Sequence, residues 1–191
     1  MARLANASGF DLPQYQSASS RYNRDPANAC AMGQIIGGYL KTYGLNLDFA
    51  PVADVNTNPA NTVIGNRAFS SDPAVAAQMV ASAVQGFHDA GILCTLKHFP
   101  GHGDTAEDSH YGTASSTKTW AEMRETELKP FAAGIAAGAD VVMTAHITTP
   151  NATQDGLPAS LSYTMLTERL RGGAGLYWDH LHRFAVHASH S

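Results

Sequence analysis

Apolar residues recur at helical spacing behind two strong start signals, and two further helices follow along the chain. Residues 25–44 and 72–91 each begin with an aspartate followed by proline, which suit the N-cap and first helical positions, and each ends at a glycine. A threonine and a glutamate at capping-box spacing start a helix over residues 119–128, from where it can continue to residue 138. A serine caps the last predicted helix, over residues 162–171.

Short apolar runs between these helices predict three strands, at residues 46–52, 92–96 and 140–145. Helices and strands therefore alternate along the chain. Such βα units imply a parallel sheet with right-handed crossovers, either as an open doubly wound sheet or as a barrel.

Polar residues directly after each predicted strand favour the barrel. Asp54 follows the first strand, Lys97 and His98 follow the second, and His146 follows the third. In β/α barrels several strands contribute to one site at their carboxyl ends, whereas an open sheet concentrates its site at one switch point. Because a complete barrel needs about 200 residues or more, we predict an α/β fold that is an incomplete TIM-like (β/α)8 barrel with parallel strands.

The composition narrows the class of protein further. With 191 residues, 44% of them hydrophobic, the chain can form one domain with a sizeable core, which excludes disordered, collagen-like and coiled-coil classes. A net charge of −4 without a Lys/Arg cluster argues against nucleic acid or an anionic membrane as the main partner. Cys30 and Cys94 suggest neither a disulfide framework nor a zinc ribbon. No membrane-spanning stretch or signal peptide is recognisable.

One segment, KHFPGHGDTAEDSH at 97–110, contains three histidines, two aspartates, a glutamate and a lysine. A polar loop of this kind is often only solvated surface, but its glycines allow it to fold back over the mouth of a barrel. Asp108 and His110 are two residues apart, so both side chains can lie on one side of an extended loop. An aspartate that accepts one imidazole N–H fixes the tautomer and makes the other nitrogen more basic, which suits proton transfer near neutral pH.

A metal site is the alternative interpretation of this segment, with His98, His102, Asp104 and His110 as ligands. His98 and His102 have the spacing of a helical zinc site, but the proline and glycines between them disfavour a helix, and no His-Glu-x-x-His motif occurs. We therefore expect a site that uses no metal or other cofactor.

The same segment resembles the signature of the family 3 glycoside hydrolases, specifically their β-N-acetylhexosaminidase branch. The motifs PVADVN at 51–56, GNRAF at 65–69 and VVMTAHI at 141–147 accompany it in the family's order, and the resemblance covers residues 1–172. It implies an enzyme that hydrolyses terminal N-acetylglucosamine β-glycosides, such as peptidoglycan or chitin fragments, with retention of configuration.

The resemblance also implies roles for individual residues. His110 is then the general acid/base, and Asp108 orients it. His146 has a structural role. The residues that would bind the sugar ring are Asp54, Arg67, Lys97 and His98, although an aspartate at a strand end can equally cap a turn.

A retaining glycosidase also needs a carboxylate that attacks the anomeric carbon. The resemblance implies that this nucleophile follows the helix at 162–171, but residues 173–191 contain four of the nine histidines and a single acid, Asp179. Codons permitted for Gly173 onward, read one base later, encode ELGYTGTIFTDSLSMQAI, which fits the strand and loop of the family. We therefore predict a partial barrel domain over 1–172 and an aberrant, disordered or out-of-frame tail over 173–191.

The first residues, MARL, resemble an internal segment of the family, which predicts that the first barrel strands are absent. Without a nucleophile no covalent intermediate forms, so we expect this chain to have little or no activity of its own. The alternative is a non-catalytic carbohydrate-binding remnant. The sequence leaves the oligomeric state open, and it is compatible with a cytoplasmic or a secreted, cell-envelope location.

Overall fold

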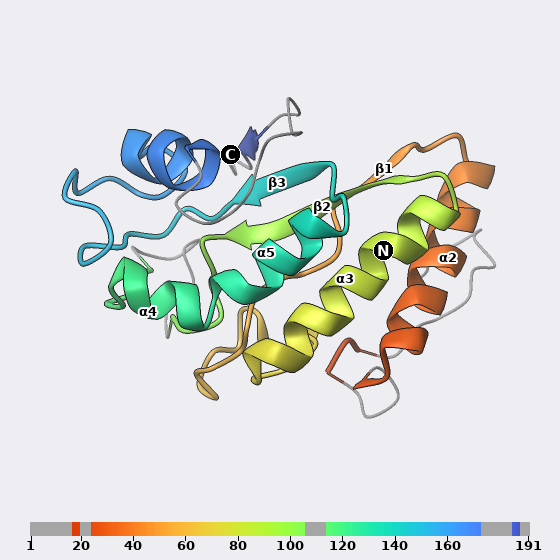
Figure 1. Ribbon diagram of the computed structural model, residues 1–191, viewed down its shortest axis with the longest axis horizontal. Helices are drawn as coiled ribbons and strands as arrows, with labels where there is room; N and C mark the ends of the chain where they lie inside the picture. Colours follow the sequence, from red (N-terminus) through yellow and green to blue (C-terminus); the bar gives the residue numbers. More distant parts are fainter. Residues whose placement is uncertain (1–16, 20–23, 106–113, 173–184, 188–191) are drawn as a thin grey trace.

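The computed structural model describes residues 17–19, 24–105, 114–172 and 185–187. Helices and strands alternate in it (Figure 1). The elements in chain order are α2 (Pro26–Thr42), β1 (Leu47–Asp48), the 3-10 turn η2 (Gly65–Arg67), α3 (Pro73–Asp89), β2 (Leu93–Phe99), α4 (Trp120–Glu125), α5 (Leu128–Ala136), β3 (Val141–Thr144), the π-helical η3 (Thr164–Arg171) and β4 (Ala185–His187).

The strands form one parallel sheet in the order β1-β2-β3-β4. β1 is shorter than the predicted strand, but parallel bonding continues beyond it. The Thr95 N–H donates to the Ala50 carbonyl at 2.7 Å, and the Ala53 N–H donates to the Lys97 carbonyl at 2.6 Å. The predicted α/β class with parallel strands is therefore confirmed.

β4 is a strand that the sequence pattern did not predict. It pairs in parallel with β3, with Val142 opposite Ala185. It falls within the predicted tail over 173–191, of which the structure describes only these three residues.

The starts of α2 and α3 confirm the aspartate-proline signals. The Asp25 carboxylate accepts the Ala27 N–H at 2.9 Å, and Asp72 accepts the N–H groups of Ala74 and Val75 at 2.8 and 3.3 Å. Each bond satisfies a backbone donor that has no partner inside the helix.

The helix predicted from residue 119 begins with the expected capping box but does not continue to 138. It ends at Glu125, and α5 begins at Leu128. The physical reason is Pro130, which has no N–H to donate and whose ring would clash with the carbonyl of Thr126, four residues earlier. The break gives α4 and α5 separate axes and places Glu127 at the corner between them.

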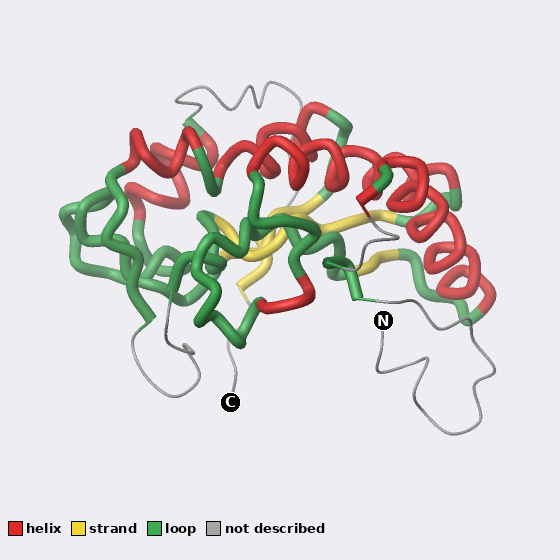
Figure 2. The backbone as a smooth tube through the Cα atoms, turned by 90° about the horizontal axis from the view of Figure 1, so that it is seen from below, coloured by secondary structure: helices red, strands yellow, loops and turns green. Residues whose placement is uncertain are grey.

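The helices α2, α3 and α5 lie on one side of the strands, and most loops lie on the other (Figure 2). α3 packs between α2 and α5. Its contact with α2 requires a glycine, since a Cβ on Gly86 would lie 2.1 Å from the Cys30 carbonyl oxygen. Between helices and sheet, the rings of Phe99 and Phe131 meet edge to face with centroids 5.5 Å apart, and both are fully buried.

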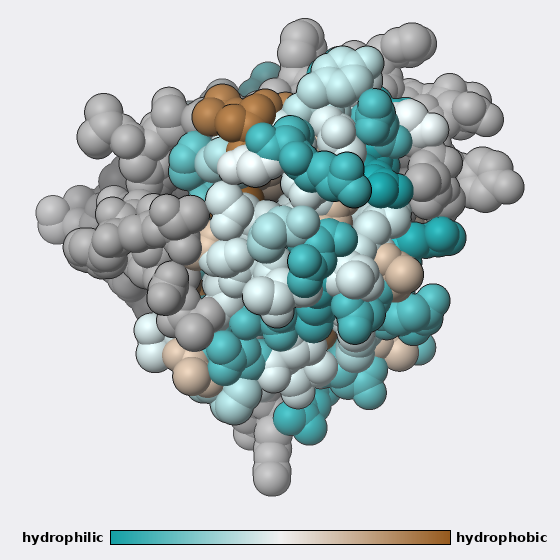
Figure 3. All heavy atoms as spheres, turned by 90° about the vertical axis from the view of Figure 1, so that its left-hand side faces the viewer, coloured by the Kyte–Doolittle hydropathy of each residue, from teal (hydrophilic) through white to brown (hydrophobic). Residues whose placement is uncertain are grey.

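The end of the molecule that carries α4 and η3 is mostly hydrophilic, with one small apolar patch (Figure 3). In the chain between β3 and η3, Leu157 and Leu161 are exposed. Within the described residues, none of the helices has the length and hydropathy that crossing a membrane requires.

Candidate active site

The loops that follow β1 and β2 pack tightly together at the carboxyl ends of these strands. The Asn58 N–H donates to the Gly103 carbonyl at 3.2 Å. A Cβ on Gly103 would lie 2.0 Å from the Val55 carbonyl oxygen, so only glycine permits this approach. The contact brings the polar residues of the two loops into one cluster.

Asp54 is the centre of this cluster. The residue is 1% exposed. One carboxylate oxygen accepts the His102 N–H at 2.7 Å, and the other pairs with the His98 ring nitrogen Nδ1 at 2.7 Å. The His98 N–H lies 3.3 Å from both oxygens. A strand-end aspartate thus holds the end of β2 at His98 and the start of the following loop at His102, rather than capping a local turn.

The pairing of Asp54 with His98 affects the pKa of Asp54 and the position of the proton on the His98 ring. Burial alone would raise the pKa of Asp54, but the His98 ring and the backbone N–H donors of His98 and His102 outweigh it and lower the pKa below its ordinary value. Because a carboxylate only accepts hydrogen bonds, Nδ1 of His98 carries a proton. Nε2 is then the ring nitrogen that remains for a ligand oxygen.

Lys97 and Arg67 complete the group of predicted sugar-binding residues. Lys97 is half-buried, and burial lowers its pKa; Asp48 and Asp54 oppose this shift, and the nearby Arg67 guanidinium adds to it. Arg67 is exposed, and its Nε and Nη2 donate to the Val63 carbonyl at 3.1 and 2.6 Å. The structure therefore brings all four predicted residues close to one another. Asp54 pairs with His98, and the charges of Asp54 and Arg67 both act on Lys97.

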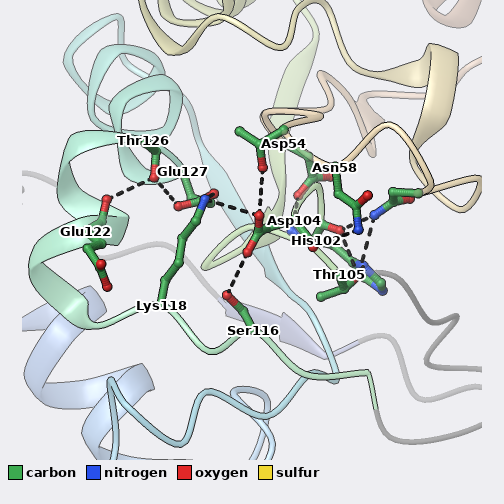
Figure 4. Close-up of polar contacts among 12 residues, drawn as sticks. Asp54, Asn58, His102, Asp104, Thr105, Ser116, Lys118, Glu122, Thr126 and Glu127 are labelled. Atoms are coloured by element: carbon green, nitrogen blue, oxygen red, sulfur yellow. Dashed lines mark hydrogen bonds and ion pairs between the residues drawn. The ribbon is translucent and has the colours of Figure 1, made fainter.

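A second polar cluster supports the loop after β2 (Figure 4). Asp104 accepts the Thr57 hydroxyl at 3.0 Å and the Ser116 hydroxyl at 3.5 Å, and it lies 3.3 Å from the Lys118 ammonium. Lys118 is also 2.5 Å from the carboxylate of Glu127, which is completely buried. Partial burial would lower the pKa of Lys118, but Glu127 and Asp104 raise it.

Sequence reasoning assigned no role to Lys118 or Glu127. The signal that could have revealed Glu127 is Pro130, because the helix break that this proline causes turns the glutamate inward. From the sequence, Asp104 is only a candidate metal ligand. In the structure it connects the loop after β1, the loop after β2 and the segment before α4.

The structure describes the surroundings of two of the other histidines. His102 is buried, and its Nδ1 lies 2.6 Å from the Thr105 hydroxyl. His146 follows β3 and places Nδ1 2.6 Å from the Ser160 hydroxyl, a contact that suits a structural role. His110 and Asp108 lie outside the described residues, so the acid/base dyad and the alternative metal site that includes His110 stay predictions.

Residues 2–179 match the family model of the glycosyl hydrolase family 3 N-terminal domain. Among curated relatives, the β-hexosaminidase of Stenotrophomonas maltophilia strain K279a is 43% identical over 169 residues, which are 86% of this chain and 49% of that protein. The chain spans about half the length of the curated relatives it matches.

Solved structures agree with this match. The β-N-acetylhexosaminidase of Beutenbergia cavernae superposes with a TM-score of 0.80 at 30% identity, covering 92% of this chain and 51% of that one. The family 3 β-N-acetylglucosaminidase of Paenibacillus sp. FPU-7 gives a TM-score of 0.74 at 40% identity, covering 82% of this chain and 29% of that one. These likenesses confirm the predicted TIM-like barrel architecture. With the signature motifs on a parallel β/α scaffold and a family model matched over most of its length, the chain belongs to glycosyl hydrolase family 3.

Proposed function

We propose that this chain carries the sugar-binding and acid/base part of a retaining β-N-acetylhexosaminidase, acting on terminal N-acetylglucosamine in peptidoglycan or chitin fragments. The names of its relatives, β-hexosaminidase and β-N-acetylglucosaminidase, support this substrate class. The observation that carries the proposal is the buried Asp54, whose contacts hold His98 beside Lys97 at the carboxyl end of β2.

Each residue has a chemical task in this proposal. Lys97 and Arg67 donate hydrogen bonds to ring hydroxyls, and Nε2 of His98 accepts one from a hydroxyl. Asp54 keeps the His98 ring in one tautomer and orientation. His110, with Asp108 on its other ring nitrogen, protonates the leaving glycosidic oxygen and later removes a proton from the attacking water.

The attacking carboxylate is the part that this sequence does not supply in a recognisable form. The single acid among residues 173–191 is Asp179, and the sequence on either side of it does not resemble the strand end that a nucleophile requires. We therefore propose that the 191-residue chain binds N-acetylglucosamine but turns over substrate at a small fraction of the rate of its longer relatives.

Calorimetry with N-acetylglucosamine, combined with hydrolysis of an aryl N-acetyl-β-glucosaminide, tests both parts. Lys97→Met removes one charged donor and keeps the length of the side chain. The loss of one charged hydrogen bond, about 1.5–3 kcal/mol, weakens binding roughly 10- to 100-fold. The matched control is Lys41→Met on the exposed surface of α2, which leaves the affinity unchanged.

The outcomes separate the parts of the proposal. If the wild-type chain binds no sugar, or if Lys41→Met weakens binding as much as Lys97→Met, the assigned sugar site is wrong. Hydrolysis at the rate of the longer relatives would contradict the missing nucleophile. If the chain binds sugar without hydrolysing it, and if His110→Ala leaves that binding unchanged, a non-catalytic carbohydrate-binding remnant is the better description.

A further inference from the structure

Three potential metal ligands meet at the end of the sheet opposite the candidate active site. His88 lies in the last turn of α3, Cys94 is the second residue of β2, and Asp140 directly precedes β3. Cys94 and His98 are four residues apart on β2, which corresponds to about 13 Å along an extended strand. The cluster is therefore separate from the group around Asp54.

The three donor atoms already lie close to one another. Nε2 of His88 is 2.9 Å from the Asp140 carboxylate oxygen Oδ2 and 3.9 Å from the Cys94 sulfur. All three donor atoms lie within 4.8 Å of one another. Ligands on a tetrahedral zinc ion, with bonds of about 2.0 to 2.3 Å, are separated by about 3.3 to 3.6 Å. Shifts of roughly half an ångström to an ångström would therefore admit an ion.

We infer that His88, Cys94 and Asp140 form a structural binding site for a borderline-soft divalent cation of the zinc class. The donor set contains one imidazole nitrogen, one sulfur and one carboxylate oxygen, which suits zinc or cobalt and disfavours magnesium or calcium. A water molecule completes the fourth position.

The surroundings meet the further requirements of such a site. Cys94 is fully buried, whereas the side chains of His88 and Asp140 are 30% and 13% exposed, so an ion reaches the cluster from the solvent side. The Cys94 N–H donates to Asp140 Oδ2 at 3.0 Å and holds the carboxylate in place.

Binding is balanced by the release of one proton. The divalent ion displaces the proton of the Cys94 thiol and forms a metal–thiolate bond. His88 binds the ion through Nε2 and keeps its ring proton on Nδ1, and Asp140 binds as the carboxylate.

An ion held there connects the end of α3 to the starts of β2 and β3. A short turn joins α3 to β2, but Asp140 lies 46 residues after Cys94 in the sequence. A bond between these segments therefore closes a long connection and resists local opening of this end of the sheet. The site thus affects stability without contacting the proposed sugar-binding residues.

Titration of the full 191-residue chain with Co²⁺ tests the inference, because cobalt bound to a thiolate gives a charge-transfer band in the near ultraviolet. We expect this band at one equivalent of bound ion, with about one proton released per ion, measured by calorimetry in two buffers. Cys94→Ala removes the band. Cys30→Ala, which alters the other cysteine, keeps it. Cobalt bound only by histidines, in the tail or near His98, gives no thiolate band.

A second variant protects the test against misfolding of Cys94→Ala. His88→Gln keeps both cysteines and replaces a partly exposed side chain, and we expect it to weaken cobalt binding about tenfold or more. Added Zn²⁺ should raise the urea midpoint of the wild type and of Cys30→Ala but not that of His88→Gln. The inference is overturned if no band forms in the wild type, if the band persists in Cys94→Ala, or if Zn²⁺ stabilises His88→Gln as much as the wild type.

Discussion

The substitution Asp54→Asn tests the centre of the candidate active site. The carboxylate of Asp54 accepts hydrogen bonds from the His102 N–H, the His98 N–H and the His98 ring nitrogen Nδ1. An asparagine offers one acceptor oxygen, which can keep the His102 contact. Its amide NH₂ group then faces two donors of His98. Each charge-assisted bond contributes about 1.5–3 kcal/mol, so we expect a loss of about 3–5 kcal/mol in the free energy of unfolding at pH 7.

The pH dependence gives a second, independent readout. The pKa of Asp54 is lower in the folded state than its ordinary value of about 3.9. A lowered carboxyl pKa stabilises the fold above the unfolded pKa, and this contribution disappears as the pH falls through the folded pKa. The gap in stability between the wild type and Asp54→Asn should therefore narrow as the pH is lowered from 5 to 3.

Urea unfolding followed by circular dichroism measures both effects. The matched control is Asp72→Asn, because asparagine and aspartate cap helices about equally well, and Asp72 caps α3. We expect this control to change stability by less than about 0.5 kcal/mol. A loss below about 1 kcal/mol in Asp54→Asn, well under the roughly 3–5 kcal/mol expected from the lost charge-assisted hydrogen bonds, would refute the reasoning. So would a gap that stays constant in acid.

Three further substitutions test the packing and the buried charges. Gly86→Ala should destabilise the chain by about 2–3 kcal/mol, because the added methyl group meets rigid backbone. Gly38→Ala has open space around its Cβ and should stabilise the chain by about 0.5–1 kcal/mol. Equal effects of the two substitutions on urea unfolding would contradict the close contact between α2 and α3. Burial raises the pKa of Asp48 to about 6, so the charged carboxylate destabilises the fold above that pH. Asp48→Asn should therefore be more stable than the wild type by about 1–3 kcal/mol at pH 8 but not at pH 4. Lys118→Met should lower the free energy of unfolding by about 3–5 kcal/mol, because it leaves the buried Glu127 without its cation. Lys129→Met, which removes a surface pair, should lower it by less than about 0.5 kcal/mol. Similar losses in the two variants would show that the buried pair stabilises the fold no more than the surface pair does.

The elements that the sequence predicted best are those whose boundaries depend on local chemistry. Asp25 and Asp72 cap their helices with the bonds that their positions beside proline imply, and Thr119 forms the expected capping box. The end of α4 does not follow from apolar periodicity, because it depends on the clash between Pro130 and the carbonyl of Thr126. Periodicity records which face of a helix is buried, but it does not record whether the backbone can continue.

The candidate site was predicted as a set of residues but not as a set of contacts. Parallel strands send their carboxyl ends to the same edge, so the positions of Asp54, Lys97 and His98 in the sequence suffice to place them near one another. That Asp54 pairs with the His98 ring, rather than capping a turn, depends on the close approach of the loops at Gly103. Such an approach joins residues more than 40 positions apart and leaves no periodic signal.

The two ends of β2 differ in the connections that reach them, and this difference suits the proposed sugar site to one end and the proposed ion site to the other. At the carboxyl end the chain leaves the sheet in loops, and loops can vary their path. The loop after β1 brings the buried Asp54 to His98 at the end of β2, and the loop after β2 brings the His102 N–H to the same carboxylate. At the amino end the chain enters the sheet by short connections, so His88 and Cys94 are separated by one tight turn and meet Asp140 through strand register alone. A cluster fixed by register tolerates little movement, which suits a structural ion but not a substrate that must enter and leave. The same strand can therefore serve binding at one end and stability at the other.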